Sequence, residues 1–141
     1  MNLALPRQKL STLAEVTGTL NTPLDLRSAL MRVLELLEEE HGTISGTITL
    51  RNRDTGDLNI EAATGMTWQV QRRAKYKVGE GITGRVVESG RHIIVPQVSQ
   101  EPLFLDKTDV WKRSGRPELS FVCVPVPVDG KTEGSLGVTL P

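Results

Sequence analysis

The composition of this 141-residue chain rules out several classes of protein before any motif is considered. Seventeen basic and seventeen acidic side chains cancel, so the whole chain lacks the positive charge typical of a nucleic-acid-binding domain. One cysteine excludes an internal disulfide framework and a multi-cysteine metal site. The longest apolar run, 121–128, is interrupted by two prolines, and no signal-peptide core precedes Pro6. We therefore expect a single cytoplasmic domain with no membrane segment.

Two helices are expected at the start of the chain. Apolar residues recur with helical spacing over 10–20. A second helix is predicted to begin at Pro23, because Thr22 is a good N-cap residue and proline is favoured at the first helical position. Its apolar stripe consists of Leu26, Leu30, Val33 and Leu37. This stripe predicts that the second helix packs against a sheet.

Strand patterns follow the helices. Apolar and polar residues alternate over 47–50 and again over 58–62, on either side of a turn at 54–57, which predicts a hairpin. Residues 66–74 are expected to form a loop or short helix over the sheet. The segment 119–128 carries apolar residues on both faces, which is typical of a strand inside a sheet. Its Pro125 and Pro127 lack N–H groups, so pairing there should be one-sided or bulged.

The most informative stretch runs from Tyr76 to Val86, where a short strand meets three glycines at 79, 81 and 84. Such a sequence favours a tight strand-to-helix corner whose backbone N–H groups can receive an anion or a polar ligand. No Lys-Ser/Thr pair follows Gly84, and the spacing is not that of a dinucleotide-binding motif. The corner therefore predicts a small-molecule pocket, followed by a short helix that ends at Gly90.

Residues 97–118 are predicted to form a long polar loop between a strand at 92–95 and the strand at 119–128. Phe104 and Trp111 are large apolar groups in this loop, and such groups in a polar segment need an explanation. We hypothesise that both close over the open face of the sheet as a lid. The complete layout predicts an α+β domain: an antiparallel sheet with the N-terminal helices on one face and a loop-covered pocket on the other.

At this point the chain resembles a GAF domain, and more narrowly the N-terminal GAF domain of the NifA type of sigma-54-dependent nitrogen-fixation transcription activators. Four segments carry the resemblance: 76–86, 95–105, 120–126 and 134–138. The Glu-Pro-Leu-Phe-Leu sequence in the second and the Ser-Phe-Val-Cys-Val-Pro sequence in the third are the more specific to the activators. The resemblance implies a GAF fold over residues 1–141, as one sensory domain.

The resemblance also implies a setting for the domain. In that family it precedes a AAA+ ATPase and a helix-turn-helix DNA-binding domain, and it adds a last helix. None of these is expected within residues 1–141, so the chain is interpreted as part of a larger regulator. Because GAF domains often pair through their helices, a homodimer is expected in the full-length protein. The domain itself is not expected to bind nucleic acid.

The same resemblance implies an input function and its partners. The expected effector is a small molecule such as 2-oxoglutarate, and the expected regulatory proteins are of the NifL or PII type. Cyclic nucleotides are the second choice, because the Asn-Lys-Phe-Asp-Glu motif of the phosphodiesterase subgroup is missing. No cofactor is expected. A competing interpretation is a protein-interaction module whose pocket is vestigial.

A dicarboxylate effector suggests a specific arrangement. One carboxylate would accept hydrogen bonds from the N–H groups of 81–84, and the other would meet an arginine fork. The arginine would come from Arg72, Arg73 or Arg85, in a region rich in basic residues. The full set of candidate ligand-binding residues is Arg72, Arg73, Tyr76, Gly81, Ile82, Thr83, Gly84, Arg85, Phe104, Trp111, Phe121 and Cys123.

Enzymatic activity is not expected from these residues. GAF-fold reductases of free methionine sulfoxide use several cysteines, and one thiol cannot both attack and resolve. Cys123 is therefore interpreted first as a small buried apolar group, and second as a redox-sensitive thiol at the pocket. His41 and His92 lie far apart without neighbouring cysteines, so no metal site is expected.

Overall fold

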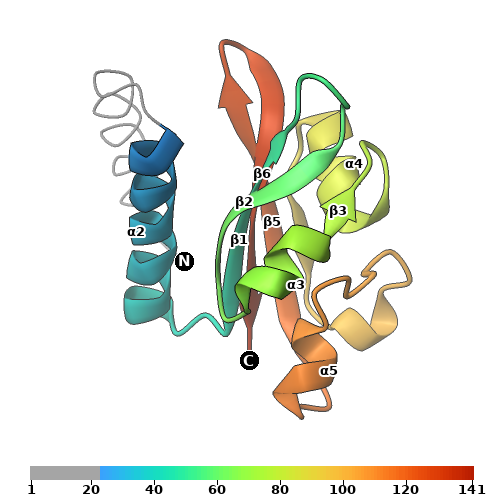
Figure 1. Cartoon of the computed structure of the whole chain (residues 1–141). Coiled ribbons are helices and arrows are strands. Elements are labelled where there is room, and N and C mark those ends of the chain that lie inside the picture. Colours follow the sequence, from blue (N-terminus) through green and yellow to red (C-terminus); the bar gives the residue numbers. More distant parts are fainter. Residues whose placement is uncertain (1–22) are drawn as a thin grey trace.

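The computed structural model describes residues 23–141, with the backbone alone described for 23–25. The helix expected at 10–20 and its neighbour Thr22 lie outside the described residues. In chain order the elements are α2 (Pro23–His41), β1 (Ser45–Arg51), β2 (Leu58–Thr64), α3 (Trp68–Arg73), β3 (Lys75–Tyr76), α4 (Gly81–Ser89), β4 (Ile93–Val95), the 3₁₀ turn η1 (Val98–Gln100), α5 (Val110–Ser114), β5 (Ser120–Val128) and β6 (Lys131–Leu140) (Figure 1).

The strands form one six-stranded sheet in the order β3-β2-β1-β6-β5-β4, and every neighbouring pair is antiparallel. The predicted hairpin is confirmed as β1 and β2. The prediction for the two prolines is also confirmed. Strand β4 pairs with β5 at Phe121–Cys123, so the second half of β5 pairs with β6 alone, and the register shifts between Val126 and Pro127.

Helix α2 covers one face of the sheet (Figure 1). Its buried residues Val33, Leu34 and Leu37 pack against Ile48, Ala62, Leu136 and Val138. Leu34 was absent from the predicted stripe, although at 1% exposure it is among the most deeply buried side chains. Burying each such leucine contributes about 1.5–3 kcal/mol, so this contact anchors the helix. No helix within residues 23–141 is long and apolar enough to cross a bilayer.

The opposite face of the sheet is covered by α4, α5 and the segment between β4 and β5 (Figure 1). A second core lies here, built from Ile82, Val86, Val95, Val98, Val110, Leu119 and Cys123. The expected α+β architecture is therefore confirmed: a helix packs on one face of an antiparallel sheet and a loop-covered region lies on the other.

The segment 97–118 is more ordered than the sequence indicated, because it contains η1 and α5. Two interactions explain the order. The Val98 N–H donates to the Leu119 carbonyl at 2.9 Å, which ties η1 to the start of β5. The Asp106 carboxylate accepts hydrogen bonds from the backbone N–H groups of Trp111 and Lys112 at 3.1 and 3.2 Å, which organises the first turns of α5.

Candidate functional site

The glycine corner predicted from the sequence is present and closely packed. Gly79 and Gly81 have φ angles of 88° and 63°, a region that glycine adopts without strain. A Cβ atom on Gly84 would lie 2.2 Å from the Lys77 carbonyl oxygen. The Gly79 N–H donates to the Gly84 carbonyl at 2.8 Å, and the Gly84 N–H donates to the Glu80 carbonyl at 2.9 Å. The Gly84 N–H is thus used inside the corner, contrary to the expectation that it faces a ligand.

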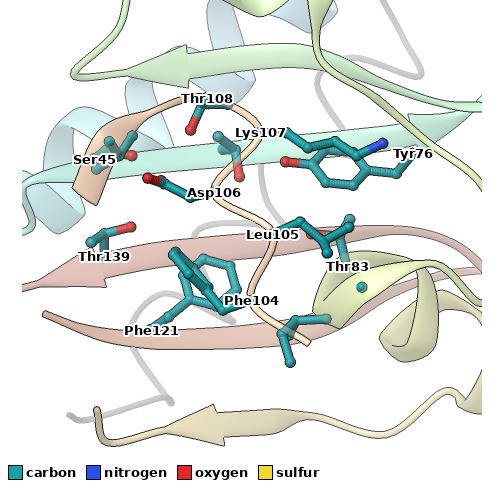
Figure 2. Close-up of a pocket in the computed structure, with 14 residues that line it drawn as sticks. Ser45, Tyr76, Thr83, Phe104, Leu105, Asp106, Lys107, Thr108, Phe121 and Thr139 are labelled. Atoms are coloured by element: carbon teal, nitrogen blue, oxygen red, sulfur yellow. The ribbon is translucent and has the colours of Figure 1, made fainter. Parts of the chain in front are cut away.

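A cavity of about 40 Å³ lies beside this corner (Figure 2). It is enclosed by the sheet, by the first turn of α4 and by the chain from 104 to 108. Six of the predicted ligand-binding residues line it: Tyr76, Gly81, Ile82, Thr83, Phe104 and Phe121. The cavity therefore brings together residues from β3, α4, β5 and the expected lid.

Eight further lining residues were not predicted. Ser45, Thr47 and Thr139 come from β1 and β6, Leu105, Asp106, Lys107 and Thr108 come from the chain before α5, and Val110 is the first residue of α5. Ser45 and Thr139 are register partners, each 3% exposed, so the two strands present neighbouring buried hydroxyls to the cavity. These hydroxyls can both donate to and accept from a polar ligand.

A signal for the hydroxyl-bearing residues existed in the sequence. Thr47 and Thr49 alternate with apolar residues along β1, a pattern usually interpreted as a solvent-facing side. In the structure this side is covered, and Thr49 is 1% exposed with its hydroxyl 2.6 Å from that of Ser135. The small hydroxyl residues at every second position of β1 therefore lie on a covered side of the strand, where Ser45 and Thr47 line the cavity.

The remaining candidates lie away from the cavity. Arg72 and Arg73 are exposed on α3, and Arg85 is exposed on α4. Arg85 faces solvent because the neighbouring positions of α4, Ile82 and Val86, are buried in the core. Within the part of the chain that the structure describes, no arginine fork therefore lines the cavity. Trp111 packs, half-buried, against the second core and does not line the cavity, so the lid expected from two aromatic residues contains Phe104 alone.

Cys123 lies in the same core without lining the cavity. Burial raises the pKa of its thiol to about 12, although hydrogen bonds from Ser135 and Thr83 act in the opposite direction. The thiol is fully buried and protonated at neutral pH, which makes it a poor nucleophile. Thr83 connects it to the cavity, because its side chain both lines the cavity and reaches the sulfur.

The charged and phenolic groups at the cavity are few. Burial raises the pKa of Tyr76 to about 12, and Cys123, Asp106 and Glu80 add to the rise. Its hydroxyl is therefore neutral, and it points into the cavity (Figure 2). Lys107 is the one cation among the lining residues. Its ammonium donates to the Glu80 carboxylate and to the Lys75 carbonyl oxygen, the latter at 2.7 Å, and lies 5.1 Å from the Tyr76 ring centroid.

The groups that line the cavity are suited to polar contacts with a small molecule. Hydroxyls, an ammonium and the first turn of α4 can orient a small polar molecule. Within residues 23–141 no three histidine, cysteine, aspartate or glutamate side chains gather in a way that could hold a metal ion.

Comparison with known proteins places the chain in a family. The family model described as "GAF domain" matches residues 24–141, so the chain belongs to the GAF domain family. It is 38% identical over 103 residues to the nitrogen fixation protein VnfA of Azotobacter vinelandii, covering 72% of this chain and 20% of that protein. It is 34% identical over 118 residues to the Nif-specific regulatory protein of Herbaspirillum seropedicae, covering 84% and 22%. The predicted resemblance is therefore confirmed, and the chain spans about a fifth of the length of these relatives.

Solved structures agree on the fold. The GAF domain of A. aeolicus nlh2, described in an inactive state, superposes with a TM-score of 0.71 at 24% identity, covering 93% of this chain and 78% of that one. The free methionine-R-sulfoxide reductase of Neisseria meningitidis, solved with its substrate, superposes with a TM-score of 0.71 at 19% identity, covering 99% and 75%. At such identities the likeness shows the fold alone, and the matched relatives of higher identity carry the names of nitrogen-fixation and regulatory proteins.

Proposed function

We propose that this chain is the sensory domain of a nitrogen-fixation transcription activator and that its cavity binds a small effector. The observation that carries the proposal is the cavity itself: buried hydroxyls of two strands, the first turn of α4 and a covering loop converge on one space. The nitrogen-fixation and Nif-specific names of the relatives support the regulatory setting. Effector occupancy would then restrain or release an attached AAA+ ATPase.

The effector class that we favour is a small carboxylate such as 2-oxoglutarate. Lys107 is a cation at the cavity, and the positive end of α4 adjoins it. The cavity of about 40 Å³ is far below the ~300–1,000 Å³ of typical ligand sites, so the covering loop must move to admit an organic acid. A cyclic nucleotide is larger than 2-oxoglutarate and demands a greater opening.

The expected protein partners remain part of the proposal. A NifL-type or PII-type regulatory protein would also restrain or release the attached ATPase. The full-length protein would act as a homodimer. All the residues that line the cavity belong to this one chain, so the effector can be tested first on the isolated domain.

One observation favours a second candidate function. The Phe104 and Phe121 rings meet at a centroid distance of 5.3 Å and occupy part of the space beside the cavity. If this contact persists in solution, the pocket is vestigial and the domain signals by docking a regulatory protein. The two candidates differ in whether any small molecule binds the isolated domain.

A thermal-shift titration of the domain against 2-oxoglutarate, cyclic AMP and cyclic GMP separates them. A ligand that binds the folded state alone adds ~2.7 kcal/mol at 100 times its Kd, which raises the melting midpoint by several degrees. A saturable shift with 2-oxoglutarate supports the proposed effector. A shift with a cyclic nucleotide alone would replace that effector class, and no shift with any of the three would favour the docking module.

A further inference from the structure

Among the described residues, Lys107 is the one side chain that makes long-range polar contacts between the covering loop, residues 103–108, and the rest of the domain. The backbone hydrogen bonds of the loop within the described chain are local: Phe104 N–H to the Glu101 carbonyl and Asp109 N–H to the Asp106 carbonyl. Lys107, in contrast, reaches Lys75 and Glu80, which lie 32 and 27 positions earlier in the sequence. The polar attachment of the loop therefore depends on Lys107.

Lys107 lines the cavity, and its ammonium reaches past the Tyr76 ring to Glu80 and Lys75, which do not line it. Its side chain runs alongside the Tyr76 ring, and its nitrogen lies beyond that ring (Figure 2). The ion pair with Glu80 is accessible to solvent, since the side chains of Lys107 and Glu80 are 29% and 37% exposed. An exposed pair of this kind is weak and exchanges partners readily.

Besides Lys107, the Glu80 carboxylate has a local partner, since it accepts a backbone hydrogen bond from Lys77. Glu80 occupies the N-cap position of α4, but its side chain makes no capping hydrogen bond. The pKa of its carboxyl group is lowered, first by the hydrogen bond from Lys107. The carboxylate of Glu80 is therefore a partner for Lys107 that a second carboxylate can replace.

Asp106 lines the cavity with its own carboxylate, which does not compete for Lys107. Its two oxygens accept the N–H groups of Trp111 and Lys112 and so stabilise α5. Leu105 packs over the corner, with its Cδ1 atom 2.9 Å from the position of a Cβ on Gly81. Displacing Glu80 from Lys107 thus removes one of the two long-range hydrogen bonds of the loop and leaves the ammonium with the Lys75 carbonyl oxygen.

We infer that Lys107 is the residue that selects a carboxylate effector, and that Glu80 is an internal carboxylate which holds Lys107 and the covering loop until the effector takes its place. The inference rests on the proposed effector-binding function. It adds that Lys107 and Glu80 are the pair of residues that determines which effector is bound. Binding then exchanges one ion pair for another, which couples the charge of the ligand to the position of the loop.

The first test needs no ligand. Hydrogen exchange of the amides at 103–108 would be compared in the wild type, Glu80→Gln, Lys107→Met and the double variant. The amides of this segment should exchange several-fold faster in each single variant than in the wild type. In the double variant they should exchange no faster than in whichever single variant exchanges more quickly. Unchanged exchange in both single variants would overturn the role of the pair in holding the loop.

The second test is calorimetric titration of the same proteins with 2-oxoglutarate. Glu80→Gln should bind several-fold more tightly, because the internal competitor is gone, and Lys107→Met at least tenfold more weakly. A purely structural latch would move both affinities in the same direction, so a common direction would overturn the exchange. Glu88→Gln and Lys112→Met make matching charge changes at exposed positions outside the cavity and should match the wild type.

The outcomes separate this inference from the proposed function. Equal 2-oxoglutarate affinity in the wild type and both single variants would overturn the exchange and leave the proposed effector standing. Binding by Glu80→Gln in the absence of detectable wild-type binding would support the exchange. No binding by any of the four proteins would overturn the exchange and the proposed effector together.

Discussion

The Phe104 ring stands edge-on against the Phe121 ring, with centroids 5.3 Å apart and planes inclined at 63°. The contact joins the covering loop to β5 across the mouth of the cavity, and β6 makes room for it with Gly137. A Cβ atom on Gly137 would lie 2.8 Å from the Phe121 ring. Three segments far apart in the sequence thus determine how much of the space beside the cavity is filled.

Replacing Phe104 with alanine should affect both stability and binding. The ring is half-buried, so we expect a loss of about 1.5–3 kcal/mol, below the 3–5 kcal/mol typical of a fully buried phenylalanine. Because Phe104 lines the cavity, 2-oxoglutarate affinity should also fall at least fivefold. Chemical denaturation and calorimetry measure the two effects. Trp111→Ala is the matched control, because it should lower stability and leave affinity unchanged.

The buried hydroxyl pair of Thr49 and Ser135 predicts an asymmetric result. Ser135 also hydrogen-bonds Cys123, so Thr49→Val leaves it a partner, whereas Ser135→Ala leaves the Thr49 hydroxyl buried and alone. We therefore expect Ser135→Ala to cost about 1–3 kcal/mol and Thr49→Val clearly less. Urea denaturation of the two single variants and the double variant gives the comparison. A larger loss in Thr49→Val would contradict the hydrogen-bond assignment.

Gly84 is predicted to be intolerant of even a methyl group. An alanine there would place its Cβ 2.2 Å from the Lys77 carbonyl oxygen and 2.9 Å from the Gly79 nitrogen, both backbone atoms that cannot move independently. We expect Gly84→Ala to destabilise the domain by about 2–3 kcal/mol and to disturb the corner. The control is Gly130→Ala, where φ is 79° and no atom lies nearby, with an expected cost of about 1 kcal/mol.

The stability of the domain should fall in alkaline solution. The folded state holds the protons of Cys123 and Tyr76 with pKa values of about 12, above the ordinary values of 9.0 for a thiol and 10.0 for a phenol. Between pH 9 and 12 the unfolded chain therefore binds fewer protons, and the free energy of unfolding decreases, by up to ~1.4 kcal/mol per pH unit for each group. Denaturation at pH 7.5 to 11 measures the slope. Cys123→Ala should remove the part that begins near pH 9.

Local sequence patterns were sufficient to predict most of the helices and strands. The hairpin of β1 and β2, the end of α4 at Gly90 and the one-sided pairing of β5 after Cys123 all follow from turn chemistry, a left-handed C-cap and missing proline donors. Each of these depends on interactions within a few residues along the chain or on the absence of a backbone donor. Such features are visible in a sequence without its tertiary structure.

Which residues line the cavity depends on packing between segments that are far apart in the sequence. The alternation in β1 identifies two faces but does not say that the face with Ser45 and Thr47 is covered. The basic residues near the corner suggested an arginine fork, yet the burial of Ile82 and Val86 turns Arg85 outward. In the sequence nothing distinguished Lys107 from the other basic residues, and only the fold of the loop places it beside Tyr76.

By itself the sequence determined the α+β architecture, the glycine corner and membership of the GAF family, because these depend on local conformation and on motifs contiguous in the chain. The tertiary structure alone decided which side chains meet at the cavity and which cation faces it. Those contacts join residues from β1, β3, β6 and the covering loop, whose relative placement results from the packing of two cores on opposite faces of one sheet.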